Sequence, residues 1–181
     1  MKKVVVFLAD GFEEIEGLTV VDLLRRAGVE VVTASVKGKK EINGAHQIMV
    51  LADELIEDID YAKVDMVVLP GGMPGTLNLA KCEMVVNIVK EFHESGKEIA
   101  AICAAPSILG DLGILAGKNA VCYPGFEERL SGAIVSEEQV IADGNITTSR
   151  GLGTAIPFAL KLIEKSVGIE EAQKIKESII Y

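Results

Sequence analysis

Aromatic side chains and basic charge are both scarce in this 181-residue chain. Phe, Tyr and Trp make up 4% of the residues, and Trp is absent. A core of this composition must be aliphatic, and platforms on which nucleic-acid bases stack are missing. The formal net charge is −9. Binding to a phosphate backbone would require a basic stripe, so we expect no nucleic-acid partner.

Long hydrophobic runs are missing as well. Asp10 ends the N-terminal apolar stretch Val4–Leu8, which is too short for a signal peptide, and no stretch approaches bilayer-spanning length. The three cysteines, Cys82, Cys103 and Cys122, are an odd number without a short motif spacing. That pattern favours a reducing compartment over a disulfide scaffold or a zinc site. We therefore expect a cytoplasmic protein with no membrane partner.

Histidine is equally rare. His46 follows Gly44 in a predicted loop, and His93 lies at the polar end of a predicted helix. Neither position is expected to serve a cysteine at a strand end, and two histidines without clustered carboxylates make a weak metal site. The sequence therefore predicts no bound metal and no cysteine–histidine pair of the protease kind.

The chain does contain a repeated alternation of strand-like and helix-like patterns. Continuous apolar runs predict buried strands, and apolar residues three or four positions apart predict helices. We expect strands over residues 4–8, 29–34, 48–51, 64–69, 99–102, 120–123, 133–135, 140–142 and 146–149, and helices over 14–27, 83–94, 104–112, 154–165 and 170–179. This order predicts one α/β domain over residues 1–181, with a mostly parallel sheet and helices on both faces.

Ligand sites in such folds lie just beyond the carboxyl ends of the strands, near a change in strand order. Three segments that follow predicted strands should meet there, namely Ala9–Glu16, Pro70–Gly75 and Cys103–Pro106. We therefore expect Cys103, Glu16 and the glycines of the second segment to lie close together.

Cys103 is the main candidate for a reactive group. It stands at a sharp junction between a strand and a helix, where small neighbours permit a tight turn and Pro106 suits the first helical turn. The N–H dipoles of a helix N-terminus favour the thiolate, which is both the nucleophile and the species that peroxide oxidises. Most cysteines are small buried hydrophobes, so these residues alone leave a structural role open.

The glycines of Pro70–Gly75 lack both the lysine-bearing ending of a P-loop and the dinucleotide-binding spacing. Their backbone N–H groups, together with that of Ala104, are placed to face a developing oxyanion, although a plain tight turn explains the glycines equally well. Glu13, Glu14 and Glu16 open a predicted helix, where acidic residues are favoured by the dipole. Periodicity alone gives Glu16 no reason to point towards the cysteine.

Four ordered segments together resemble the ThiJ/PfpI superfamily and, within it, the branch that contains the parkinsonism-associated protein deglycase. They are Ala9–Glu16, Val68–Gly72, Ala100–Pro106 and Thr148–Thr154. The resemblance covers nearly the whole chain. It implies a flavodoxin-like three-layer sandwich, usually assembled as a homodimer, whose reactive cysteine sits in a nucleophile elbow.

The resemblance also implies roles for individual residues. The family's nucleophilic cysteine falls on Cys103, and its partner glutamate falls on Glu16. The family's backbone oxyanion donors fall on Gly72 and Ala104. Glu16 is expected to hold a proton when the cysteine is ionised, because two anions in one desolvated pocket repel each other.

Two further residues are candidate substrate contacts, Tyr123 and Arg150. Many family members carry a histidine before a proline where this chain has Tyr123 followed by Pro124. Tyrosine is a poor base at neutral pH, so the peptidase activity of some relatives is not expected here. Glu16 would have to move the proton instead.

The implied function is a cofactor-independent glyoxalase or deglycase that acts through Cys103 and Glu16 on methylglyoxal-type α-oxoaldehydes or their adducts with proteins. The alternative is a non-enzymatic peroxide sensor or redox-regulated chaperone that uses oxidised Cys103. A third alternative, a thiazole-biosynthesis or amidotransferase-like role, rests on shared fold alone, and fold is weak evidence of function.

Overall fold

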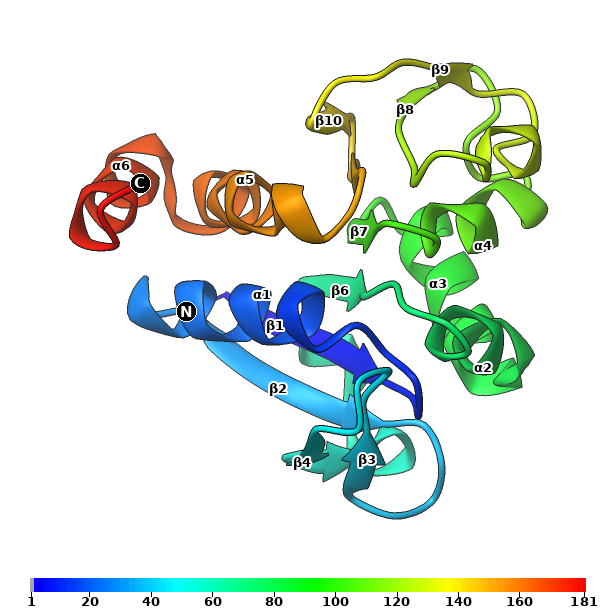
Figure 1. Ribbon diagram of the computed structural model, residues 1–181, viewed down its shortest axis with the longest axis horizontal. Helices are drawn as coiled ribbons and strands as arrows, with labels where there is room; N and C mark the ends of the chain where they lie inside the picture. Colours follow the sequence, from blue (N-terminus) through cyan, green and yellow to red (C-terminus); the bar gives the residue numbers. More distant parts are fainter. Residues whose placement is uncertain (1) are drawn as a thin grey trace.

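A seven-stranded sheet runs through the centre of the molecule (Figure 1). The computed structural model describes residues 2–181. The strands of this sheet are β1 Lys3–Leu8, β2 Glu30–Ser35, β5 Glu54–Leu55, β6 Met66–Leu69, β7 Glu98–Ile102, β10 Val140–Asp143 and β11 Ile146–Ser149. Their order is β10-β11-β7-β6-β1-β2-β5, and each neighbouring pair is parallel except β10 with β11.

Strand β1 is buried on both faces, as its continuous apolar run predicts. Every side chain from Val4 to Leu8 is at most 1% exposed. Val4, Val6 and Leu8 point into one apolar layer, whereas Val5 and Phe7 point into the other. This alternation follows from the two-residue period of a strand, and it ties the two halves of the core together through one central element.

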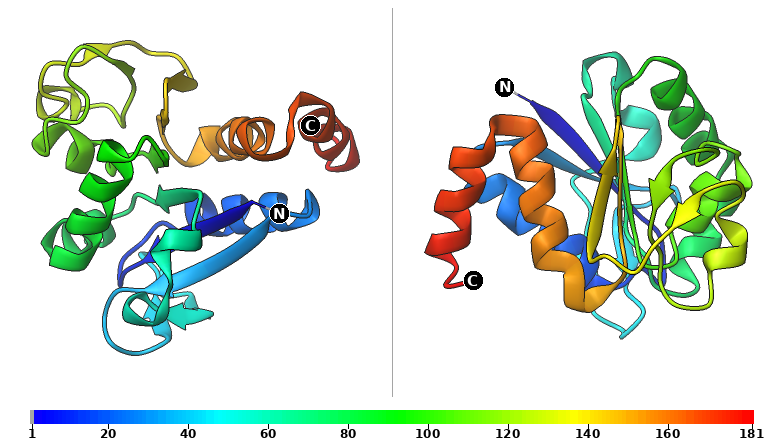
Figure 2. Two further views of the ribbon diagram at one scale, coloured as in Figure 1. Left: turned by 180° about the vertical axis from the view of Figure 1, so that it is seen from behind. Right: turned by 90° about the horizontal axis from the view of Figure 1, so that it is seen from above.

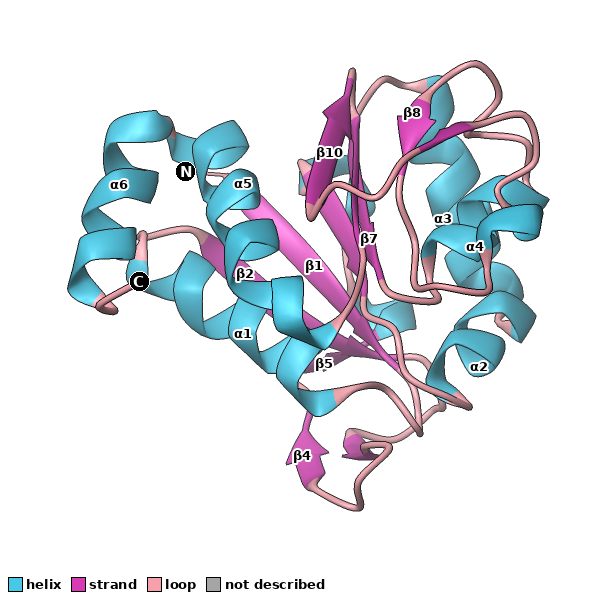
Figure 3. Cartoon of the chain, turned by 45° about the horizontal axis from the view of Figure 1, so that its top comes forward, coloured by secondary structure: helices cyan, strands magenta, loops and turns pink. Residues whose placement is uncertain are grey.

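Helices cover both faces of the sheet (Figures 2 and 3). They are α1 Glu14–Arg26, α2 Gly75–Lys81, α3 Glu83–Glu94, α4 Pro106–Asp111, α5 Ala155–Val167 and α6 Ile169–Ser178. Helices α1, α5 and α6 share one apolar layer with the sheet, and α2, α3 and α4 share the other. Within residues 2–181, no helix has both the length and the apolar character needed to cross a membrane. The expected three-layer α/β sandwich is confirmed.

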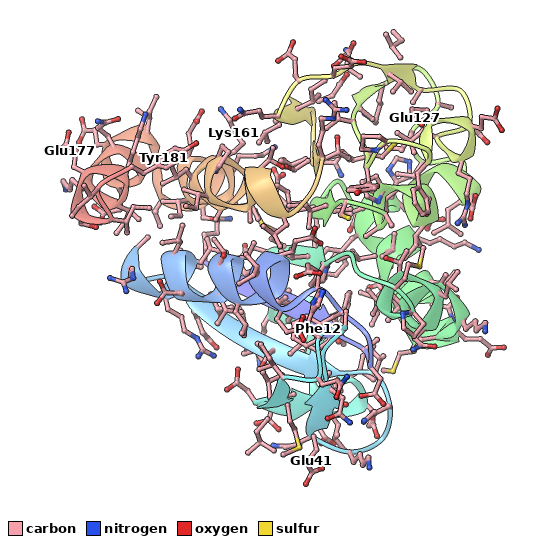
Figure 4. All side chains as sticks on the ribbon, in the orientation of Figure 1. Phe12, Glu41, Glu127, Lys161, Glu177 and Tyr181 are labelled. Atoms are coloured by element: carbon pink, nitrogen blue, oxygen red, sulfur yellow. The ribbon has the colours of Figure 1, made fainter. Side chains whose placement is uncertain are left out.

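Two small strand pairs lie outside the main sheet. Strands β3 (Glu41–Asn43) and β4 (Met49–Leu51) form an antiparallel hairpin that extends beyond β2 in Figure 1, and β8 (Asn119–Ala120) pairs with β9 (Ile134–Val135). The hairpin docks on the loop that follows β1, because Ala45 N donates to Phe12 O at 2.8 Å. Figure 4 places the buried Phe12 between the start of α1 and the hairpin that carries Glu41.

Three expected element boundaries are wrong. The predicted strand over residues 120–123 is shortened to β8, because Val121 N donates to the Thr148 hydroxyl and Tyr123 N to Cys103 O rather than to a strand ladder. The predicted helix over residues 104–112 begins later, at Pro106. The predicted strand over residues 64–69 also begins later, at Met66. Helix α2 was not predicted, since the Pro and Gly residues before it hide the short helical pattern.

Gly110 provides a test of the packing around α4. A Cβ atom there would lie 2.0 Å from Arg129 O and 2.7 Å from Leu130 Cα. We expect Gly110→Ala to lower the free energy of unfolding by about 1–3 kcal/mol, even though alanine favours helices by about 1 kcal/mol. Urea denaturation measures the change. Gly153→Ala is the matched control, because its Cβ would meet no atom within 4 Å. Equal stability of the two variants would contradict the close approach.

Candidate active site

The three segments expected to converge do meet at the carboxyl edge of the sheet. Glu13 N, in the loop after β1, donates to Gly71 O, which follows β6, at 2.9 Å. Gly75 N donates to Gly11 O at 3.0 Å, so the two loops are joined twice. Cys103 follows β7, the neighbour of β6 in the sheet. The parallel register therefore brings the ends of β1, β6 and β7 to one place.

Cys103 occupies a strained backbone position between β7 and α4. Its φ angle is +66°, in the left-handed region that residues other than glycine rarely adopt. Two backbone bonds hold the residue there: Cys103 N donates to Ser149 O at 2.9 Å, and Tyr123 N donates to Cys103 O at 2.8 Å. The sharp bend turns the thiol out of the sheet, as a nucleophile elbow does.

Glu16 lies in the first turn of α1 and points towards this thiol. Its carboxyl group is hydrogen-bonded to Cys103, and its Oε2 atom accepts a hydrogen bond from Gly71 N at 2.9 Å. The residue is 1% exposed. Position 71 admits only glycine here, because a Cβ would lie 2.5 Å from Cys103 Cβ and 2.6 Å from Glu16 Oε2.

Two backbone N–H groups also point towards the sulfur of Cys103. Both Gly72 and Ala104 donate hydrogen bonds to Cys103, and each favours the ionised thiol. Gly72 has a φ angle of +90°, and a Cβ there would lie 2.3 Å from Glu13 N. The four residues predicted to form the reactive centre are therefore brought together, although their roles stay predictions.

Burial dominates the electrostatics of the pair. It raises the pKa of Glu16 to about 7, with hydrogen bonds from Cys103 and Gly71 opposing the shift. Burial, followed by the charge of Glu16, raises the pKa of the Cys103 thiol to about 12. The charge of Glu16 makes ionisation of the thiol harder, so the negative charge that the pair carries near neutral pH lies on the carboxyl group.

The two candidate substrate contacts lie beside the pair. Tyr123 and Arg150 line one cavity of about 550 Å³. A Cβ on Gly151, in the wall of this cavity, would lie 3.2 Å from the Tyr123 ring and 4.0 Å from Glu16 Oε1. The Tyr123 side chain is half exposed, and Arg150 donates from Nη1 to Glu137 O at 3.2 Å. Both side chains can therefore meet a molecule that approaches from this side.

The other two cysteines lie outside this hydrogen-bonded group. Cys82 is half-buried at the junction of α2 and α3. Cys122 is 3% exposed, and burial raises the pKa of its thiol to about 11.

His46 is a residue that the sequence analysis misplaced. The β3–β4 hairpin folds its tip onto the start of α1, so that His46 Nδ1 lies 3.0 Å from Glu14 Oε2 and 3.5 Å from Glu13 Oε2. The expectation that no carboxylates cluster around a histidine is therefore wrong. Asn43-Gly44 is a common hairpin-turn pair, and it was the available signal that this loop folds back. Glu14, expected to be a solvated helix-start acid, is 2% exposed.

Comparison with known proteins finds a matching family model and several relatives that are similar over nearly the full length of this chain. The model of the DJ-1/PfpI family matches residues 2–165. Protein dj-1beta of Drosophila melanogaster is 36% identical over 99% of this chain and 97% of its own length. Protein DJ-1 homolog B of Arabidopsis thaliana is 39% identical, also over 99% of this chain. The chain spans less than half of that relative, 41%, and 46% of its homolog A.

Two further similar proteins are a relative whose name gives an activity and a protein of known structure. The glutathione-independent glyoxalase DJR-1.2 of Caenorhabditis elegans is 31% identical over 90% of this chain and 87% of its own length. The structure of oxidized Toxoplasma gondii DJ-1 superposes with a TM-score of 0.96 at 39% identity, covering 100% of this chain and 99% of that one.

The raised pKa of Glu16 predicts a pH-dependent stability. Between the ordinary pKa of 4.5 and the folded value of about 7, the folded chain holds a proton that the unfolded chain has lost. The contribution is therefore fully present below the lower value and is lost as pH rises towards the upper one, at a cost on the order of 3 kcal/mol.

We expect Glu16→Gln to remove this loss, because the amide cannot ionise and its oxygen can still accept from Gly71 N. Urea denaturation at about pH 5 and about pH 8 should give a flatter pH dependence for this variant than for the wild type. Glu138→Gln, at an exposed position, should leave the dependence unchanged. Identical slopes for all three proteins would show that Glu16 does not titrate in this window.

Proposed function

This chain belongs to the DJ-1/PfpI family, and we propose that it is a cysteine-dependent enzyme acting on small α-oxoaldehydes such as methylglyoxal, or on their early adducts with proteins. The observation that carries the proposal is the hydrogen-bonded pair of Cys103 and Glu16, with the N–H groups of Gly72 and Ala104 directed at the same sulfur. The Caenorhabditis elegans relative, named a glutathione-independent glyoxalase, supports the same chemistry.

The first step is addition of the Cys103 sulfur to the aldehyde carbon, with the carboxylate of Glu16 taking the thiol proton as the sulfur attacks. A carbon–sulfur bond forms while the carbonyl π bond breaks, and the oxygen takes the proton held by Glu16 to give a hemithioacetal. The N–H groups of Gly72 and Ala104 lie at the thiol and are positioned to stabilise the charge that develops on the oxygen. A carboxyl pKa of about 7 suits this exchange, since both protonation states are populated near neutral pH.

The second step moves a proton between neighbouring carbons. Glu16, now a carboxylate, removes the proton from the carbon bonded to sulfur and returns it to the adjacent carbonyl carbon. The hydroxyl proton of the hemithioacetal passes to the neighbouring oxygen, which becomes a hydroxyl. The first carbon is thereby oxidised to a thioester and the second is reduced. Water hydrolyses the thioester, releasing lactate and restoring the thiol. The net reaction is addition of water to methylglyoxal, so electrons balance within the substrate.

The cavity beside the pair would receive the rest of the substrate. Tyr123 can donate a hydrogen bond there, and Arg150 supplies a positive charge. Because Tyr123 is a poor base, Glu16 is the group that moves protons in this scheme, and peptide hydrolysis is not part of the proposal. A homodimeric assembly stays a prediction from the family resemblance, and a cytoplasmic location stays a prediction from the cysteine pattern and the short apolar runs.

A second candidate function uses the same sulfur as a peroxide sensor. The thiolate attacks one peroxide oxygen and expels water to give a sulfenic acid, and a second peroxide takes it to a sulfinic acid. The N–H groups and Glu16 around Cys103 would hold the added oxygens. This candidate is favoured by the match to a structure described as oxidized, that of Toxoplasma gondii DJ-1.

The enzyme proposal predicts glutathione-independent conversion of methylglyoxal to lactate by the purified protein. Cys103→Ala should abolish turnover, and Glu16→Gln should lower kcat by about 10²–10⁴-fold, because the amide cannot carry the proton. Cys82→Ala is the matched control for loss of a thiol and should keep wild-type turnover. Lactate production by the wild type no faster than by Cys103→Ala would exclude this activity.

The sensor candidate predicts selective oxidation of one residue. Under limiting peroxide, intact mass and peptide mapping should show two oxygens on Cys103 before any on Cys82 or the methionines. Cys103→Ala should gain none under the same conditions. Oxidation that begins elsewhere would remove this candidate, whereas rapid oxidation of a protein without aldehyde turnover would favour it over the enzyme.

A further inference from the structure

Two carboxylates and an imidazole gather where the β3–β4 hairpin meets the start of α1. The three groups are Glu13, Glu14 and His46, and their nearest donor atoms all lie within 4.8 Å of one another. Glu13 and Glu14 precede and open α1, whereas His46 is at the hairpin tip more than thirty residues later. None of these three side chains takes part in the proposed chemistry.

The two carboxylates of this cluster are largely buried and lie close to each other. The side chains of Glu13 and Glu14 are 13% and 3% exposed. No lysine or arginine among residues 2–181 forms an ion pair with either carboxylate, and no described donor hydrogen-bonds to the Glu13 carboxylate. Two desolvated like charges repel each other, so a positive charge between the carboxylates of Glu13 and Glu14 would stabilise them.

The distances within the cluster match those between ligands of one metal ion. His46 Nδ1 lies 3.0 Å from Glu14 Oε2 and 3.5 Å from Glu13 Oε2. A tetrahedral zinc ion with bonds of about 2.0–2.1 Å separates its ligand atoms by about 3.3 Å. The two distances from His46 lie on either side of that separation, and the distance between the two carboxylates is at most 4.8 Å, so side-chain movements can place one ion between the three atoms.

The surrounding backbone holds these donors in place. Glu14 Oε1 accepts hydrogen bonds from His46 N at 2.8 Å and from Ile48 N at 3.4 Å. Its other oxygen, Oε2, is left facing the imidazole. A carboxylate oriented by hydrogen bonds to its second oxygen is the usual arrangement of a metal ligand and its supporting shell. The Gly44 position reinforces the docking, because a Cβ there would lie 2.1 Å from Glu14 Oε1.

We propose that Glu13, Glu14 and His46 bind a divalent transition-metal ion, with Zn²⁺ as the ion that their chemistry fits best. An imidazole with two carboxylates suits zinc, whereas Mg²⁺ and Ca²⁺ prefer oxygen ligands alone. Three protein ligands leave the fourth position to water or an exchangeable ligand. The His46 side chain is 67% exposed, which provides the path by which the ion enters. Protonation of His46 would compete with binding of the metal ion at this position.

The test is a calorimetric titration of the purified, chelator-treated protein with Zn²⁺. The wild type should bind one ion per chain, and an excess of Mg²⁺ should not displace it. His46→Ala and Glu13→Gln should each weaken binding by about 10- to 100-fold. His46 is exposed and Glu13→Gln preserves shape, so both variants should fold; circular dichroism checks this.

Two controls separate this site from other zinc ligands. His93→Ala removes the other histidine, and Cys103→Ala removes the reactive thiol; both should bind Zn²⁺ as the wild type does. With Co²⁺ in place of Zn²⁺, the wild type should show the visible spectrum of a four-coordinate ion, and His46→Ala should not. Absence of saturable binding, unchanged binding in His46→Ala and Glu13→Gln, or loss of binding in Cys103→Ala would each overturn the proposal.

Discussion

Glu16 and Cys103 meet in space that a side chain at position 71 would otherwise fill. The hypothetical Cβ of Gly71 collides with both residues, so the contact between carboxyl and thiol depends on the absence of one methyl group. The same glycine donates its N–H to Glu16 and accepts from Glu13 through its carbonyl oxygen. The loop after β6 is therefore the connection that fixes α1 relative to the elbow after β7, and the order of strands β7-β6-β1 makes that connection short.

The parts of the fold that were predictable from the sequence are those whose local pattern and tertiary environment agree. Strands β1 and β6 are buried on both faces, so their apolar runs identify them directly. Helices α3 and α5 bury one stripe each and show the corresponding period. The strand at β8 was predicted to be too long because the apolar residues after it are buried. Their backbone N–H groups donate to the Thr148 side chain and to Cys103 O, not to a neighbouring strand. Burial alone does not make a strand.

The residues of the candidate site were also predictable from the sequence only where their signal is local. Cys103, Ala104 and the glycines after β6 were candidates because the end of a parallel strand and the glycines after another strand are local signals for one sheet edge. Gly72 and Glu16 were singled out by resemblance to a family, and the direction of Glu16 depends on how α1 packs against two loops. His46 was missed for a related reason. Its approach to Glu14 depends on the hairpin folding back onto the loop after β1, a contact between segments with no shared periodicity.

Two glutamates in the first turn of α1, Glu14 and Glu16, illustrate how position, not residue type, decides ionisation. Burial acts to raise the pKa of Glu14, but hydrogen bonds from backbone N–H groups and from His46 outweigh it, so the pKa of this carboxyl is lowered. Burial prevails at Glu16 and raises its pKa to about 7, with the charge of Glu13 adding to the shift. Neighbouring groups whose pKa values are pushed apart in this way can take different tasks. The ionised Glu14 holds the hairpin, and Glu16, able to gain or lose a proton near neutral pH, is the one that faces the thiol.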